Sequence, residues 1–150
     1  MVDKSLNLNL HLGLIRTLFP HAAIIKINRQ APDNAWSCYR TFFNQGQSWS
    51  YNLADIKHYF QQEAKLNQHW QTLFGDSLLE VNYEDLVQQP ETSIRLCLEH
   101  IGLNYQAKLL EFYQSKQLVQ TASVGQVRQA INTKSIGIPA SLAKYFTDFL

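Results

Sequence analysis

The stretch that decides the fold is AAIIKINRQAPDNAWSCYR, residues 22–40. Its first part, Ala22 to Ile27, is a short apolar run rich in isoleucine, which is typical of a buried strand. Asp33, directly after Pro32, suits the N-cap of a helix that follows the strand. That helix carries its large side chains at helical spacing, at Trp36, Tyr39, Arg40 and Phe43. The stretch therefore predicts a strand followed by a helix.

The rest of the chain predicts one more strand and several helices. The second strand is SLLEVNY, from Ser77 to Tyr83. Apolar periodicity predicts helices over residues 8–19, from Asn52 or Asp55 to Phe74, and over 91–101, 106–116 and 141–150, with an irregular segment over 122–139. Two strands separated by helices indicate an α/β fold that is rich in helix and has a few parallel strands.

Composition excludes several classes of protein. A chain of 150 residues with 45% hydrophobic and 12% aromatic residues fits one globular domain. Thirteen Lys and Arg against twelve Asp and Glu give a net charge of +1, which argues against a nucleic-acid partner. No apolar run approaches the roughly 18 residues that a membrane span needs, so we expect no membrane partner. Two cysteines are too few for a disulfide framework and predict reduced thiols in a cytoplasmic protein.

The junction between the first strand and its helix carries the candidate chemistry. Arg29 lies at the carboxyl end of the strand, and Ser37 lies eight residues later in the helix. Ligands of α/β folds bind at such carboxyl ends, and a guanidinium with a hydroxyl suits a phosphate. On spacing alone the ordinary alternative, a surface arginine and a helix serine, remains preferred. Neither GxGxxG nor GxxxxGK[ST] occurs.

Five short segments occur in order along nearly the whole chain. They are DK at 3–4 with LGLI at 12–15 and LFP at 18–20; R at 29 with SCY at 37–39; GQ at 46–47 with WSY at 49–51; V at 81 with YEDLV at 83–87 and PE at 90–91; and TAS at 121–123 with QVR at 126–128. Together they resemble the sulfotransferases that use 3′-phosphoadenosine-5′-phosphosulfate. The resemblance is closest to the bacterial group often fused to tetratricopeptide repeats, which is related to tyrosylprotein sulfotransferases. It implies a P-loop-NTPase-like sulfotransferase fold.

The resemblance also implies roles for single residues. Arg29 and Ser37 would hold the 3′-phosphate of the nucleotide, and Tyr83 would contact it. Ser123 would lie near the transferring sulfuryl group or the 3′-phosphate. Lys4 would stabilise charge on the bridging and sulfuryl oxygens. The structural alternatives are a frayed N-terminal residue for Lys4 and a core tyrosine at a strand end for Tyr83.

The resemblance covers only part of the segments that form the family's active site. The family's 5′-phosphosulfate loop, of the type PKSGTT, and its catalytic Glu or His precede the matching region. Residues 1–150 therefore resemble the carboxyl-terminal half of a sulfotransferase domain, and we expect weak activity from this half alone. The family's final glycine-tryptophan element becomes Gly137-Ile138-Pro139 here. Lys134 would replace the lost positive charge, unless it is an ordinary solvated lysine.

Two hypotheses of different classes follow. In the first, the chain is a sulfotransferase-type domain that transfers a sulfuryl group to an acceptor hydroxyl once an upstream half is supplied by a longer chain or a partner. In the second, it is a non-catalytic remnant that binds nucleotides or proteins. Its apolar face, left open by missing strands, would then drive dimerisation or aggregation.

Overall fold

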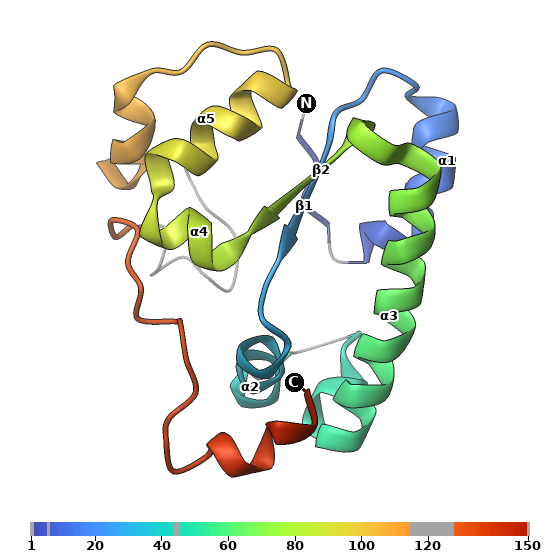
Figure 1. The fold of residues 1–150 in the computed structure, drawn as a ribbon, viewed down its shortest axis with the longest axis vertical. Helices are drawn as coiled ribbons and strands as arrows, with labels where there is room; N and C mark the ends of the chain where they lie inside the picture. Colours follow the sequence, from blue (N-terminus) through green and yellow to red (C-terminus); the bar gives the residue numbers. More distant parts are fainter. Residues whose placement is uncertain (1, 6, 44–45, 115–127, 150) are drawn as a thin grey trace. The chain divides into compact units, whose positions relative to one another are not determined.

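The computed structural model of the chain describes residues 2–5, 7–43, 46–114 and 128–149 (Figure 1). The strands are β1 (Ile24–Asn28) and β2 (Leu78–Asn82), and the α-helices are α1 (Leu12–Leu18), α2 (Ala31–Arg40), α3 (Leu53–Phe74), α4 (Tyr83–Gln88) and α5 (Pro90–His100). Short 3₁₀ segments are η1 (Leu8–His11), η2 (Ser48–Tyr51), η3 (Gly75–Ser77), η4 (Ala107–Gln114), η5 (Ala143–Tyr145) and η6 (Thr147–Phe149). Within these residues no helix is long and apolar enough to cross a bilayer.

Strands β1 and β2 pair with each other in a parallel two-stranded sheet. Both strands are short and rich in branched apolar residues, IIKIN and LLEVN, which favour a pleated and largely covered surface. The helices between them provide the crossover that a parallel pair requires. The predicted helix-rich α/β class with parallel strands is therefore confirmed.

The chain divides into two compact units. Unit 1 comprises Met1–Lys26, Gln30–Leu79 and Gly137–Leu150, and unit 2 comprises Ile27–Arg29 and Glu80–Ile136. The carboxyl ends of both strands therefore belong to unit 2, together with α4 and α5.

The first apolar core of unit 1 forms where α1 meets α3. Leu12, Trp70 and Leu78 are buried together there. Gly13 lies against the same tryptophan, because a Cβ atom at Gly13 would stand 3.3 Å from the Trp70 ring. Contacts that close are tighter than ordinary packing, so glycine suits this position.

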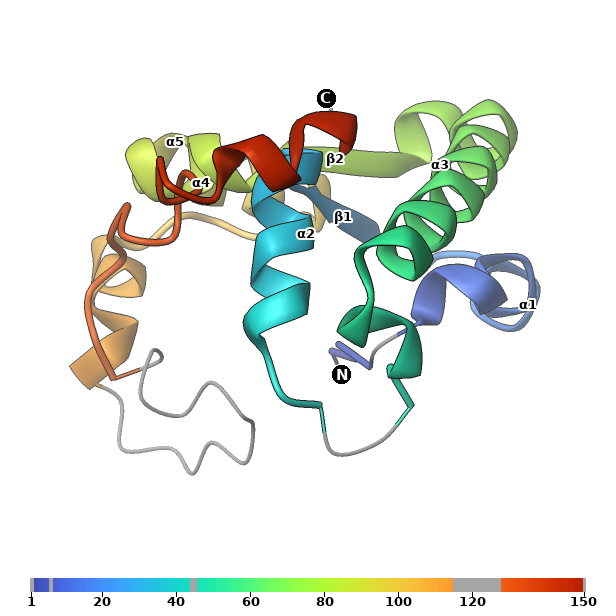
Figure 2. The same ribbon diagram turned by 90° about the horizontal axis from the view of Figure 1, so that it is seen from below.

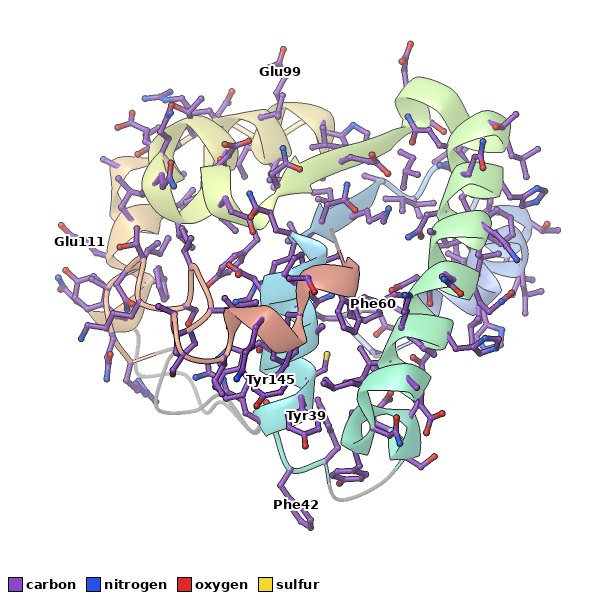
Figure 3. The ribbon with its side chains drawn as sticks, turned by 60° about the horizontal axis from the view of Figure 1, so that its bottom comes forward. Tyr39, Phe42, Phe60, Glu99, Glu111 and Tyr145 are labelled. Carbon is purple, nitrogen blue, oxygen red and sulfur yellow. The ribbon has the colours of Figure 1, made fainter. Side chains whose placement is uncertain are left out.

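The second core of unit 1 lies between α2, α3 and the C-terminal turns. Ala35, Ile56 and Phe146 are its buried residues, and Phe60 faces the C-terminal turns with its ring 6.1 Å from that of Phe149. Figures 1 and 2 both show η6 beside α2. Figure 3 shows Phe42, just after α2, projecting away from this core, with 80% of its surface exposed.

The prediction of a continuous helix over residues 141–150 is wrong. The described part of this segment forms the two 3₁₀ turns η5 and η6 instead. Phe146 lies between the two turns, and its ring lies 5.9 Å from that of Phe149 at the end of η6. Packing of these rings on the core outweighs the weak preference of a ten-residue segment for an α-helix.

Helix α2 also begins earlier than predicted. It starts at Ala31, and its first turn contains Pro32, which is favoured there because its fixed φ suits a helix. Asp33 is therefore inside the helix and is not its N-cap. Its buried carboxylate accepts a 2.6 Å hydrogen bond from the backbone N–H of Gly137 instead. This bond ties the C-terminal segment of unit 1 to α2.

Helix α3 begins where the sequence predicts. The Oδ1 atom of Asn52 accepts hydrogen bonds from the backbone N–H groups of Ala54 (2.8 Å) and Asp55 (3.4 Å). These groups have no partner inside a helix, so the asparagine stabilises its start. The helix ends at Gly75, whose φ of 49° favours glycine.

Replacing Asn52 with alanine should lower the free energy of unfolding by about 1 kcal/mol, because the cap is lost. Thermal denaturation followed by circular dichroism measures this change. Asn52→Asp, which keeps a capping oxygen, should stay near the parent. An Asn52→Ala protein as stable as the parent would show that the cap adds nothing.

Unit 2 contains a helix that the sequence analysis missed. Helix α4 follows β2 without a loop and packs on α5 (Figure 1). Six residues are too few to display a helical period, and only the first residue of this helix, Tyr83, falls within the predicted strand from Ser77 to Tyr83. The helix predicted over 106–116 is a kinked 3₁₀ segment, with non-helical φ and ψ at Glu111. A hollow of about 260 Å³ opens between β2, α4 and α5.

Candidate functional site

Two of the predicted site residues meet at the carboxyl ends of the strands. Arg29 directly follows β1, and Tyr83 directly follows β2. Because the strands are parallel, both residues leave the same edge of the sheet. Within unit 2 the guanidinium carbon of Arg29 lies 4.8 Å from the centroid of the Tyr83 ring. This is a cation–π contact, and it holds the guanidinium over the ring.

A third group fixes Arg29 from far along the chain. Its Nη2 donates a hydrogen bond to the backbone carbonyl of Ser135. Ser135 carries no signal in the sequence, because a backbone carbonyl is common to every residue. The adjacent Lys134 has an exposed side chain, and its backbone N–H donates to Oδ1 of Asn132 at 3.1 Å. The predicted Lys134 therefore lies next to the residue that anchors Arg29.

The Arg29 guanidinium contains one N–H donor that lacks an acceptor among the described residues. Its Nε atom is buried and has no hydrogen-bond partner among the described residues. A buried N–H without a partner costs about 1–3 kcal/mol, so a fitting acceptor would be bound favourably. Guanidinium donors match the oxygens of a phosphate, whose negative charge also offsets the charge of the arginine. The arrangement thus fits an anion such as a phosphate. Among the described residues, no cluster of three or more His, Cys, Asp or Glu side chains could hold a metal ion.

Ser37 belongs to unit 1, whereas Arg29, Tyr83 and Ser135 belong to unit 2. It is half-buried in α2, and its backbone carbonyl accepts a 2.7 Å hydrogen bond from Oγ1 of Thr41. Its hydroxyl role therefore stays a prediction from the sequence. Ser123 lies outside the described residues.

Lys4 lies in the N-terminal segment of unit 1 with an exposed side chain. The neighbouring Asp3 carboxylate accepts hydrogen bonds from Ser5 Oγ (2.7 Å) and from the Ser5 backbone N–H (2.9 Å). These bonds hold the pKa of the Asp3 carboxyl below its usual value, the side-chain bond most strongly. The Asp3 carboxylate therefore bonds to Ser5, and the side chains of Asp3 and Lys4 are both exposed to solvent.

Comparison with known proteins agrees with the sequence resemblance at the level of the family. A family model described as "Sulfotransferase family" matches residues 1–107. An uncharacterized protein of Aquifex aeolicus (strain VF5) is similar, with 33% identity over 150 residues. The alignment covers 98% of this chain and 20% of that protein. The chain thus spans about a fifth of the length of this curated relative.

Proposed function

Because this chain belongs to the sulfotransferase family, we propose that it forms the nucleotide-binding, carboxyl-terminal part of a sulfotransferase domain. The donor would be 3′-phosphoadenosine-5′-phosphosulfate, and the acceptor a hydroxyl group. The bound nucleotide supplies the sulfuryl group, whose transfer resembles phosphoryl transfer in needing in-line positioning and fixed positive charge. The thiols of Cys38 and Cys97 form no disulfide, which supports a cytoplasmic location.

The arrangement of Arg29 carries this proposal. Its guanidinium is held by the Tyr83 ring and the Ser135 carbonyl, and its buried Nε still needs an acceptor. A 3′-phosphate would satisfy that donor and balance the charge. Tyr83 would serve twice, since its ring orients the arginine and offers a surface to the nucleotide.

The remaining roles are supported by the resemblance. Ser37 would donate its hydroxyl to the 3′-phosphate, and Ser123 would act near this phosphate or the sulfuryl group. Lys134 would add positive charge beside the Arg29 anchor. Lys4 would act as a compact point charge on the bridging and sulfuryl oxygens.

The proposed domain also needs a partner. We assign the 5′-phosphosulfate loop and the catalytic base to an upstream half, supplied by a longer chain or a second protein. The length of the Aquifex relative, about five times that of the aligned region, supports the occurrence of such segments within larger proteins. A second copy of the chain is the other partner that would cover an open apolar face.

Calorimetric titration tests the nucleotide site directly. The chain should bind adenosine 3′,5′-bisphosphate and bind adenosine 5′-monophosphate at least about tenfold more weakly, because the second ligand lacks the charged group that Arg29 recognises. Equal affinities would contradict a 3′-phosphate site. A well-folded chain that binds neither nucleotide would instead support the interaction remnant.

Replacing Ser37 with alanine should weaken binding of adenosine 3′,5′-bisphosphate by about 1–2 kcal/mol, near the lower end of what a hydrogen bond to a charged group contributes. The dissociation constant from the same titration should therefore rise roughly 5–30-fold. Ser48→Ala, at an exposed serine outside the proposed site, is the matched control. A Ser37→Ala protein with parental affinity would remove Ser37 from the site.

A further inference from the structure

One face of α3 holds the segment that follows Lys4. The hydroxyl of Tyr59 donates to Oδ1 of Asn7 at 3.2 Å, and Nδ2 of Asn9 donates to Oε1 of Glu63, also at 3.2 Å. Nε1 of Trp70 donates to the backbone carbonyl of Asn9 at 2.7 Å. Figures 1 and 2 both show η1 beside α3. We call the three helix residues, Tyr59, Glu63 and Trp70, the α3 anchor.

The spacing of the anchor residues explains why they act together. Intervals of four and seven residues return to the same side of an α-helix, so all three side chains face η1. Two of these side chains, Tyr59 and Trp70, are also held by ring contacts of their own. The ring of Tyr59 stacks on Trp49 at 4.0 Å with an interplanar angle of 5°, and Trp70 stacks on Phe74 at 5.4 Å. Rigid side chains give up little rotamer freedom when they bind a segment.

Asn7 marks the point where the chain turns towards α3. Its φ of 63° is the left-handed conformation, and among the described residues it is the only one other than glycine with positive φ. Asparagine tolerates this conformation better than most residues. Its backbone carbonyl accepts a 3.0 Å hydrogen bond from Leu10, which starts η1. The bend and the anchor together define where the N-terminal segment leaves the helix.

Glu63 is suited to an anchor in either protonation state. Burial raises the pKa of its carboxyl, and the positive charge of Lys26 acts in the opposite direction. Its Oε1 atom accepts the hydrogen bond from Asn9 whether the carboxyl is charged or neutral. This contact therefore does not depend on ionisation of the glutamate.

We infer that Tyr59, Glu63 and Trp70 are positioning residues that fix the backbone carrying Lys4, through Asn7 and Asn9. Three residues of chain reach at most about 11 Å, so anchoring Asn7 confines Lys4 to a small region. This inference rests on the role proposed above for Lys4. A lysine stabilises the charge that develops on the sulfuryl oxygens most effectively when its backbone is already fixed. Otherwise the entropy lost in ordering the backbone adds to the activation barrier.

Hydrogen exchange of the complete chain tests the anchor. The double variant Tyr59→Phe/Glu63→Ala removes two of the three hydrogen bonds and keeps the ring that stacks on Trp49. Exchange in residues 8–11 should become roughly 5–30-fold faster, while α5 keeps its parental rate. Glu63→Gln, which retains an acceptor for Asn9, should stay within about twofold of the parent. If the double variant does not fold, Tyr59→Phe alone removes one hydrogen bond and should give a smaller increase in the exchange rate of residues 8–11. Parental exchange in residues 8–11 of both Tyr59 variants would overturn the anchor.

A comparison of two nucleotides then tests the link to Lys4. The sulfuryl-bearing donor and adenosine 3′,5′-bisphosphate differ in the group that Lys4 would contact. Lys4→Ala and the double variant should both lower affinity for the donor relative to the bisphosphate, by roughly 5–30-fold. A Lys4→Ala protein that keeps the parental ratio would overturn the role proposed for Lys4. A reduced ratio in Lys4→Ala with a parental ratio in the double variant would overturn positioning by α3.

Discussion

Arg29→Ala is expected to abolish measurable binding of adenosine 3′,5′-bisphosphate, with a loss of at least about 100-fold. Hydrogen bonds to charged groups contribute about 1.5–3 kcal/mol, and the arginine offers a planar fork of donors to a single phosphate. The cation–π contact with the Tyr83 ring and the hydrogen bond to the Ser135 carbonyl preorganise this fork. Little entropy is therefore lost when the phosphate binds, so truncation removes nearly the whole contribution.

Two further variants separate the charge of Arg29 from its geometry. Arg29→Lys keeps the positive charge but has no fork, so its affinity should lie between those of the parent and the alanine variant. Tyr83→Phe keeps the ring beneath the guanidinium and should change the affinity by less than about threefold, on the scale of one weak contact. Calorimetry at one fixed salt concentration measures all three. Parental affinity in Arg29→Ala would place the phosphate elsewhere.

Ile56→Ala is expected to have the largest effect on stability. Ile56 is fully buried, with 0% of its surface exposed, between Ala35 and Phe146 in the second core of unit 1. Truncation removes buried methyl groups and leaves a cavity, which together cost about 2–5 kcal/mol. That is a large part of the roughly 5–15 kcal/mol that stabilises a typical domain. The melting temperature should fall by on the order of 10 °C.

Two control variants for Ile56→Ala change residues of the same helix, α3. Leu73→Ala loses the same kind of side chain at a position that is 59% exposed, and should shift the free energy by no more than about 0.5 kcal/mol. Ile56→Val removes a single methylene and should cost about 1 kcal/mol. Denaturant titration of the three variants measures these differences. Equal losses in Ile56→Ala and Leu73→Ala would show that burial at position 56 contributes nothing.

Local patterns predicted most of the elements of this fold. Branched apolar runs bounded by turn residues predict both strands. The asparagine at the start of α3 and the glycine at its end predict this helix. Arg29 and Tyr83 were predicted as site residues from the resemblance, and their meeting follows from parallel strands that share one edge. Their contact with each other was not predicted, since a cation–π contact depends on side-chain orientation.

The features that sequence patterns did not predict depend on distant partners. Asp33 looks like an N-cap from its neighbours, but its carboxylate binds the N–H of Gly137, which lies 104 residues away. The C-terminal turns are 3₁₀ because two phenylalanines fit one core. The α3 anchor pairs asparagines near the start of the chain with a helix more than fifty residues later. Such pairings are set by tertiary packing, which has no local signature.

The hydrogen bond between Arg29 and the Ser135 carbonyl also determines when the proposed phosphate site can form during synthesis. The two residues are 106 positions apart in the chain. A ribosome adds about 5–20 residues per second, so the arginine emerges roughly 5–20 s before the carbonyl that holds it is made. During the second half of that interval the nascent chain already contains Tyr83 and both strands. The arginine is therefore anchored only after Ser135 has been synthesised, and a chain truncated before Ser135 would contain both strands but an unanchored arginine.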